Sequence, residues 1–154
     1  MALEDDILFL RRIATFRVLG PDALRVLAIG VEKLHLRAGD ILFEEGEPAD
    51  CGYAIEAGVI RLRRATEKAL DEPVLIRAGA LIGESALLIE TDRPASAIAM
   101  EPSTLYKIPR GMFMRMLESD VEAAAGLREM ISRRVNAALD DLDTVLPRFA
   151  PKGA

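Results

Sequence analysis

Apolar residues at the start of the chain recur at helical spacing. These residues are Ile7, Leu8, Leu10 and Ile13. A second helical segment begins at Gly20-Pro21-Asp22, where the acidic side chain favours an N-terminal helical turn. Its apolar face is formed by Leu24, Leu27 and Ala28. The pattern predicts an N-terminal helical segment over residues 1–30.

The periodicity changes to two between residues 31 and 109. In KLHLR, Leu34 and Leu36 alternate with polar residues, as in a strand with one buried face. Further short apolar runs follow, separated by glycine-containing turns such as Ala57-Gly58 and the turn around Gly79. Many short strands at near-regular spacing predict a jelly-roll-like β-barrel over residues 31–109.

Helical periodicity returns over residues 110–146. One face of GMFMRMLESD holds Phe113, Met116 and Leu117, and a longer helix follows until Pro147 stops it. Apolar residues along this longer helix are spaced close to a heptad seam: Leu127, Ile131, Val135, Ala138, Leu142 and Val145. The seam has two interpretations. It is either a lid helix lying on its own barrel or a helix that pairs with its twin in a homodimer. Residues 147–154 form a tail.

Length and composition place these segments in one domain. The chain has 154 residues, about the size of one domain, and 51% of them are hydrophobic, which supports a packed core. The formal net charge of -5 argues against non-specific binding to nucleic acid or to an anionic membrane. Cys51 is the only cysteine, so no disulfide forms within the chain. The sequence has neither a signal-peptide pattern nor a long apolar run, and we expect a cytoplasmic protein.

Few residues suit catalysis or metal binding. His35 is the only histidine, so a histidine-based zinc site has too few ligands, and no nucleophile-elbow motif accompanies it. The acids in residues 44–50 do not have the spacing of a helix-flanked calcium loop. We therefore expect no catalytic residues and no metal site.

A candidate binding site lies in LIGESALLIETDRPASAIAM, residues 81–100. Gly83 permits a close backbone approach, and a helical turn over residues 85–88 would present unpaired amides to an anion. Arg93 has the forked donors that a phosphate needs, whereas Glu84 would repel a phosphate and suits sugar hydroxyls. Sugar plus phosphate indicates a nucleotide. An ion pair between Glu84 and Arg93, or two solvated side chains, would explain the same two residues.

The wider pattern resembles the cyclic nucleotide-binding domain, the sensor module of catabolite-activator-type regulators, cyclic-nucleotide-dependent kinases and gated channels. The resemblance rests on LRAGDILFEEGEPADCGYAIEAGVIRL followed by GALIGESALLIETDRPASAIA. The second stretch is similar to the family's phosphate-binding cassette, with matches at Gly83, Glu84, Ala86, Leu87 and Arg93. The resemblance implies a mainly β fold: a jelly-roll-like β-barrel with N-terminal helices, a short cassette helix and a long C-terminal helix.

The resemblance also implies roles for individual residues. Glu84 would accept a hydrogen bond from the ribose 2′-hydroxyl, and Arg93 would pair with the cyclic phosphate. Backbone amides near Gly83, Ser85 and Ala86 would line the site. Three barrel residues would approach the base or the sugar: Val74, Ile76 and Leu81.

Pro94 departs from the family pattern. Family members usually carry Ala, Ser or Thr directly after the arginine, and the amide of that residue faces the phosphate. Proline has no N–H, so one contact is lost. A hydrogen bond to a charged group is worth about 1.5–3 kcal/mol, which is roughly tenfold or more in affinity. Ser96 is the candidate substitute donor.

The resemblance implies a stand-alone sensor of a cyclic nucleotide, with cyclic AMP expected over cyclic GMP on general prevalence. Family transcription factors carry a helix-turn-helix domain after the long helix, whereas this chain ends eight residues after Leu146. We therefore expect no DNA-binding domain and an output through an unknown partner protein. The alternative is a protein-interaction module of the same fold that binds no nucleotide or a different phosphorylated ligand.

Overall fold

A computed structural model describes residues 2–130 and residue 133 of the chain. The helices before the strands are α1 (Ala2–Arg12), the 3₁₀ helix η1 (Ala14–Val18) and α2 (Pro21–Gly30). The strands are β1 (Glu32–Leu36), β2 (Ile41–Phe43), β3 (Pro48–Ala49), β4 (Cys51–Ala57), β5 (Val59–Arg63), β6 (Val74–Arg77), β7 (Leu81–Ile82), β8 (Thr91–Asp92), β9 (Ser96–Ala99) and β10 (Ser103–Pro109). A second 3₁₀ helix, η2 (Glu84–Leu87), lies between β7 and β8. Helix α3 (Arg110–Ser119) follows β10, and residues 121–130 are helical again.

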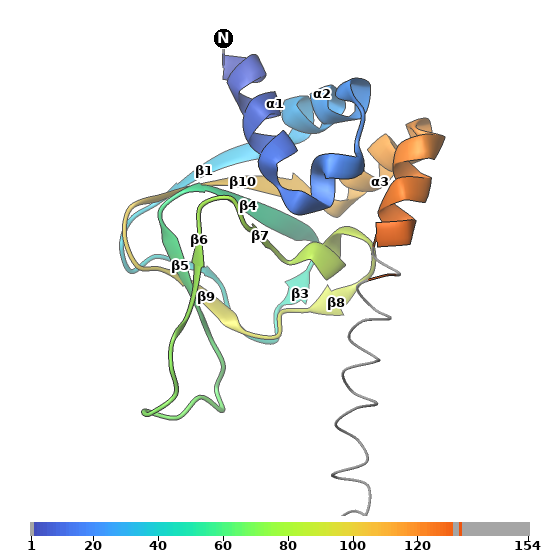
Figure 1. The fold of residues 1–154 in the computed structure, drawn as a ribbon. Helices are drawn as coiled ribbons and strands as arrows, with labels where there is room; N and C mark the ends of the chain where they lie inside the picture. The colour runs from blue at the N-terminus through green and yellow to red at the C-terminus, as the bar shows by residue number, and fades with distance from the viewer. Residues whose placement is uncertain (1, 131–132, 134–154) are drawn as a thin grey trace, which may run out of the picture.

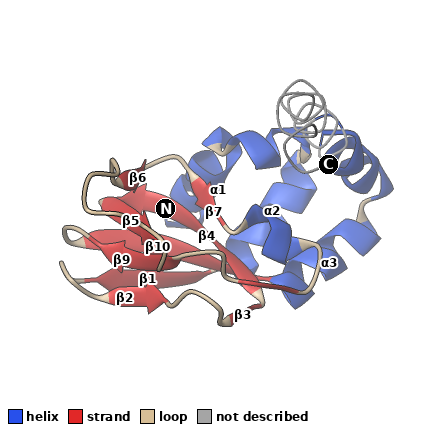
Figure 2. Cartoon of the chain, turned by 90° about the horizontal axis from the view of Figure 1, so that it is seen from below, coloured by secondary structure: helices blue, strands red, loops and turns tan. Residues whose placement is uncertain are grey.

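The strands form two four-stranded antiparallel sheets and a two-stranded ribbon. The first sheet has the order β1-β10-β4-β7, the second has the order β2-β9-β5-β6, and β3 pairs with β8. Figure 1 shows α1 and α2 over the side of β1, β10 and β4, and Figure 2 shows the strands and the helices occupying separate halves of the molecule. This mainly β arrangement with flanking helices confirms the expected fold class.

Two hydrophobic clusters share the first sheet. The helical cluster lies between that sheet and the helices, and it includes Phe16, Leu27, Phe113, Leu127 and, from the strands, Ala54, Tyr106 and Ile108. The barrel cluster lies between the two sheets, and its members are Phe43, Cys51, Tyr53, Ile55, Ile60, Ile82, Ala97, Ala99 and Leu105. Successive side chains of β4 and β10 therefore alternate between the clusters. Because both faces of β4 are covered, its first five residues are all buried.

Two glycines allow side chains of neighbouring helices to approach closely. A side chain on Gly30, at the end of α2, would lie 2.6 Å from the Cγ of Met112 in α3. One on Gly126 would lie 3.3 Å from the Cβ of Val18, so the segment of residues 121–130 packs against η1. The expected inner face of α3 is present, since Phe113, Met116 and Leu117 are all buried.

The C-terminal seam lies mostly beyond the described residues. Leu127 is 2% exposed and belongs to the helical cluster. Ile131, Val135 and Leu142 lie outside the described residues, so the choice between a lid and a dimer helix stays a prediction, as do the segment boundaries 1–30, 31–109, 110–146 and 147–154. Within the described part of the chain, no helix has the length and hydropathy needed to span a bilayer.

Candidate functional site

The segment from β7 to Arg93, called the cassette here, leaves the first sheet at the boundary between the two clusters. Leu81 packs against the helical cluster, and the next residue, Ile82, belongs to the barrel cluster. Gly83 follows with φ of 78°, and η2 begins directly after it. The cassette therefore begins at a point where one residue contacts the helical cluster and the next contacts the barrel cluster.

Gly83 is required at this position for two reasons. Its positive φ is one that side-chain-bearing residues rarely adopt. In addition, a Cβ there would lie 2.6 Å from Nη1 of Arg93 and 3.3 Å from the carbonyl oxygen of Cys51. The missing side chain is what allows the guanidinium to lie against the start of the cassette.

Among the residues that the structure describes, Arg93 is the only charged one that is buried, with 5% of its surface exposed. Its Nη2 donates to the carbonyl oxygen of Cys51 at 2.9 Å and to the Cys51 Sγ at 3.3 Å. The guanidinium carbon lies 4.3 Å from the ring centre of Phe43 and 5.4 Å from that of Tyr53. Among the described residues, no carboxylate forms an ion pair with Arg93. The charge is therefore held by aromatic faces and a carbonyl dipole.

Glu84 faces the other half of the molecule. Its carboxylate accepts a hydrogen bond from the hydroxyl of Thr15 in η1. Thr15 is 3% exposed and lies between Ile13 and Phe16, both members of the helical cluster. In the described part of the chain, Glu84 and Arg93 are not joined by an ion pair. A simple salt bridge therefore does not account for these two residues.

The other predicted ligand-binding residues differ in exposure and in hydrogen bonding. Ser85 is exposed, while Ala86 is 1% exposed and its amide donates to the carbonyl of Gly83 at 3.1 Å, which closes η2. The hydroxyl of Ser96 accepts a hydrogen bond from the backbone N–H of Glu45 at 2.9 Å. Ser96 also lines an outer hollow together with Ile98, whereas Ala97 between them is buried in the barrel cluster.

A cavity of about 500 Å³ adjoins the end of the cassette. Its walls include Leu62, Val74, Pro94 and Ala95, so the residues directly after Arg93 form part of it. Val74 is 51% exposed there. Ile76 packs against the barrel cluster, and Leu81 packs against the helical cluster, so the three expected lining residues do not all meet in this cavity.

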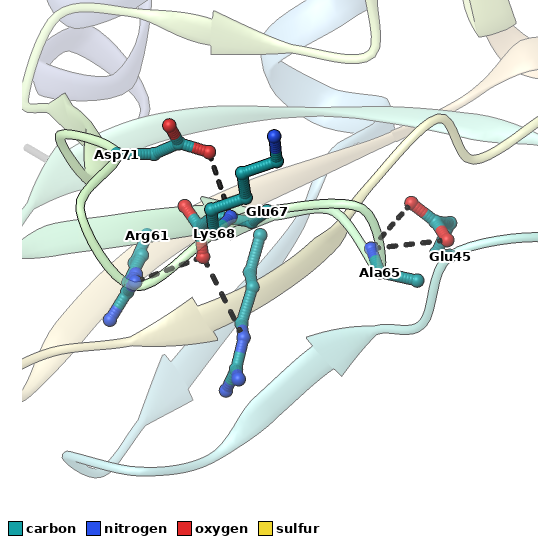
Figure 3. A network of polar contacts seen from close by, with 7 residues as sticks. Glu45, Arg61, Ala65, Glu67, Lys68 and Asp71 are labelled. Atoms are coloured by element: carbon teal, nitrogen blue, oxygen red, sulfur yellow. Dashed lines mark hydrogen bonds and ion pairs between the residues drawn. The ribbon is translucent and has the colours of Figure 1, made fainter.

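The far wall of the cavity is the loop of residues 64–73 between β5 and β6, which polar contacts hold in place (Figure 3). The Glu67 carboxylate lies 3.0 Å from Nη2 of Arg61 and 3.7 Å from Nε of Arg63. The Asp71 carboxylate accepts from the amide of Lys68 at 2.7 Å, and the Glu45 carboxylate accepts from the amide of Ala65 at 3.3 Å. The loop is thus folded back onto β5 and the β2–β3 connection.

Three residues near the cassette were not predicted from the sequence. They are Thr15, Cys51 and Arg110. Nη1 of Arg110 donates to the carbonyls of Ala49 and Ile89 at 3.2 and 2.7 Å, which links α3 to β3 and to the connection between η2 and β8. Thr15 and Cys51 lie 69 and 42 residues from their cassette partners, and no local motif marks such pairs.

Tyr53 presents a neutral aromatic ring to Arg93. Burial raises the pKa of its phenol far above the ordinary value, and a hydrogen bond with Cys51 raises it further. The ring therefore stays neutral across the physiological range and presents an aromatic face to the guanidinium. No group of three or more His, Cys, Asp or Glu side chains in the described residues is arranged to hold a metal ion.

Comparison with known proteins gives a family match over the barrel. A sequence model described as "Cyclic nucleotide-binding domain" matches residues 33–120. A cyclic nucleotide-binding-like protein from Brucella abortus is 40% identical with a TM-score of 0.64, and the match covers 74% of this chain and 98% of that chain. The N-terminal domain of a transcriptional regulator from Streptomyces coelicolor is 26% identical with a TM-score of 0.77, over 87% and 94% of the two chains.

A curated enzyme contains a similar segment. Lysophospholipase NTE1 of Chaetomium globosum is 28% identical over 130 residues, which are 82% of this chain. This chain spans only 8% of the length of that enzyme. The similarity therefore concerns one module of a much larger protein.

Proposed function

Because the chain belongs to the cyclic nucleotide-binding domain family, we propose that it is a regulatory sensor that binds a cyclic nucleotide at the cassette, with cyclic AMP as the first candidate. The ligand would lie with its phosphate at Arg93, its ribose at Glu84 and its base toward the cavity beside Val74. Output would pass to a partner protein, and the domain itself would catalyse no reaction.

The buried guanidinium of Arg93 carries this proposal. A charge taken out of water is costly unless an opposite charge or several hydrogen bonds compensate it. Within the described residues Arg93 has aromatic faces, one carbonyl and one thiol, but no carboxylate. A cyclic phosphate supplies one negative charge and oxygen acceptors, so it is a suitable counter-ion for the guanidinium.

Gly83 supports the same assignment of the phosphate end. Since Nη1 of Arg93 lies where a Cβ of residue 83 would be, the backbone at the start of η2 and the guanidinium share one side of the site. An anion bound to Arg93 would therefore be close to the backbone of Gly83 and Glu84. The Ala86 amide already donates within η2, which favours Ser85 over Ala86 as an additional donor.

Pro94 supports the alternative, a protein-interaction module that binds no nucleotide. Pro94 offers no amide. Ser96, the candidate substitute donor, lines the outer hollow of the second sheet, where its hydroxyl accepts a hydrogen bond from the Glu45 amide. We therefore expect weaker binding than in relatives with an amide at this position, and Pro94→Ala should increase affinity about tenfold.

Isothermal titration with cyclic AMP and with cyclic GMP tests the proposal. The wild-type protein should bind cyclic AMP, and Arg93→Ala should lower the affinity by about a hundredfold or more, because it removes the charge and its hydrogen bonds. Arg115→Ala, which removes an exposed arginine of α3, is the matched control and should leave affinity unchanged. Absence of binding of either nucleotide at millimolar concentration would contradict the proposal and favour the interaction module.

A further inference from the structure

The two side chains that a nucleotide would bridge are held by different halves of the molecule. Arg93 lies on Phe43 and Tyr53 of the barrel cluster. Glu84 accepts a hydrogen bond from Thr15, which is buried among residues of the helical cluster. One end of the candidate site is thus directed toward the barrel, and the other end is tied to η1.

We propose that the Thr15–Glu84 hydrogen bond is a latch that a ribose 2′-hydroxyl has to displace. Thr15 would then determine how strongly the domain distinguishes a ribose from a deoxyribose. This inference rests on the proposed function, since it concerns the sugar end of the same site.

The expected contribution of the 2′-hydroxyl to affinity follows from the replacement of one donor to Glu84 by another. The Thr15 hydroxyl and the ribose 2′-hydroxyl are both O–H donors, and both would donate to the Glu84 carboxylate. When the ribose replaces Thr15, one charge-assisted hydrogen bond is gained and one is lost. The buried Thr15 hydroxyl is also left without its carboxylate acceptor, which is unfavourable. In the wild-type protein the 2′-hydroxyl therefore adds little to affinity.

Removing the Thr15 hydroxyl should release this cost. Thr15→Val keeps the side-chain shape and removes the donor, so Glu84 can turn to the ribose without losing a partner in η1. The affinity for cyclic AMP should then rise about tenfold or more. The affinity for 2′-deoxy cyclic AMP should not change, because that ligand makes no demand on Glu84.

The experiment is isothermal titration of both ligands into four proteins. Wild type and Thr15→Ser, which retains the hydroxyl, should bind the two ligands within about threefold of each other. Thr15→Val should prefer cyclic AMP by about tenfold or more. Thr104→Val is the matched control, because the Thr104 hydroxyl contacts His35 on β1, away from the cassette. It should behave as wild type.

Several outcomes would overturn the latch. They are an unchanged or lower affinity of Thr15→Val for cyclic AMP, or an equal gain for both ligands. If Thr15→Val does not fold, the wild-type protein decides alone: a preference for cyclic AMP over the deoxy ligand of about tenfold or more contradicts the latch. Binding of neither ligand by wild type contradicts the proposed function and the latch together. Binding that depends on Arg93 but not on Thr15 contradicts the latch only.

Discussion

The helical cluster and the barrel cluster hold the two ends of the cassette in different ways. At the barrel end, Arg93 is stacked on Phe43 and Tyr53, which offer no negative charge. At the helical end, Glu84 is bound to the hydroxyl of Thr15. Within the described residues the positive end lacks an ionic partner, whereas the negative end has a hydrogen-bond donor from the protein. Under the proposed function, the barrel end would receive an anion without losing an ionic partner, while the helical end would exchange one hydrogen-bond donor for another.

The largest loss of stability should come from a substitution that creates a cavity in the helical cluster. Phe113 is 1% exposed, and its ring centre lies 6.0 Å from that of Phe16. Phe113→Ala should cost about 3–5 kcal/mol of unfolding free energy, measured by urea denaturation. If the clusters are separate in stability, hydrogen exchange should speed up in α1 and α2 more than in β5 and β9. Equal loss of protection in both regions would show that they unfold as one unit.

A pair of glycines separates backbone strain from crowding at Arg93. Gly79 and Gly83 have φ values of 94° and 78°, and a Cβ on Gly79 would meet nothing within 4 Å. Gly79→Ala should cost about 1–3 kcal/mol from strain alone. Gly83→Ala should cost at least as much and should also abolish nucleotide binding, because its Cβ displaces the guanidinium. Equal nucleotide affinity of the two variants, measured by titration, would show that the position of Arg93 is not critical.

A smaller loss of stability is expected when the contacts of the loop of residues 64–73 are removed. Its contacts with Arg61 and Arg63 are partly exposed ion pairs, which contribute about 0–1 kcal/mol. Glu67→Gln should lower stability by no more than that and should increase hydrogen exchange within the loop. Binding at Arg93 should be retained, since the loop borders only the cavity. Loss of all nucleotide affinity would show that the cavity end contributes more to binding than the phosphate end at Arg93.

The smallest expected change in stability comes from the two tyrosines, one in each cluster, and it appears only at alkaline pH. Burial is the main cause that raises the pKa of both Tyr53 and Tyr106, and hydrogen bonds with Cys51 and Asp6 raise them further. The folded state therefore favours the neutral phenols. Their contribution to stability is complete below the ordinary phenol pKa of about 10 and is lost as the pH rises above it.

Phenolate absorbance can follow this directly, because the chain has only these two tyrosines and no tryptophan. No titration step should occur near pH 10, and absorbance should rise together with unfolding at higher pH. Tyr53→Phe leaves Tyr106, which reports the helical cluster, and Tyr106→Phe leaves Tyr53, which reports the barrel cluster. A step near pH 10 in either variant would show that the remaining tyrosine is not shielded.

Local patterns explain why much of the fold could be predicted. Alternation at Leu34 and Leu36 and glycine turns such as that at Gly79 fix strands and reversals over a few residues, and these features appear in the structure. The apolar face of α3 follows in the same way from helical spacing. The pairing of β3 with β8 was not visible, since two-residue strands carry no period.

The sequence by itself determined the fold family and the position of the cassette, with Gly83, Glu84 and Arg93 in the expected order and spacing. Only the tertiary structure decided which residues these side chains contact. The reason is physical: Arg93 meets Cys51 from 42 residues away and Glu84 meets Thr15 from 69 residues away. Contacts between such distant residues depend on how the sheets and helices pack, and no local pattern encodes them.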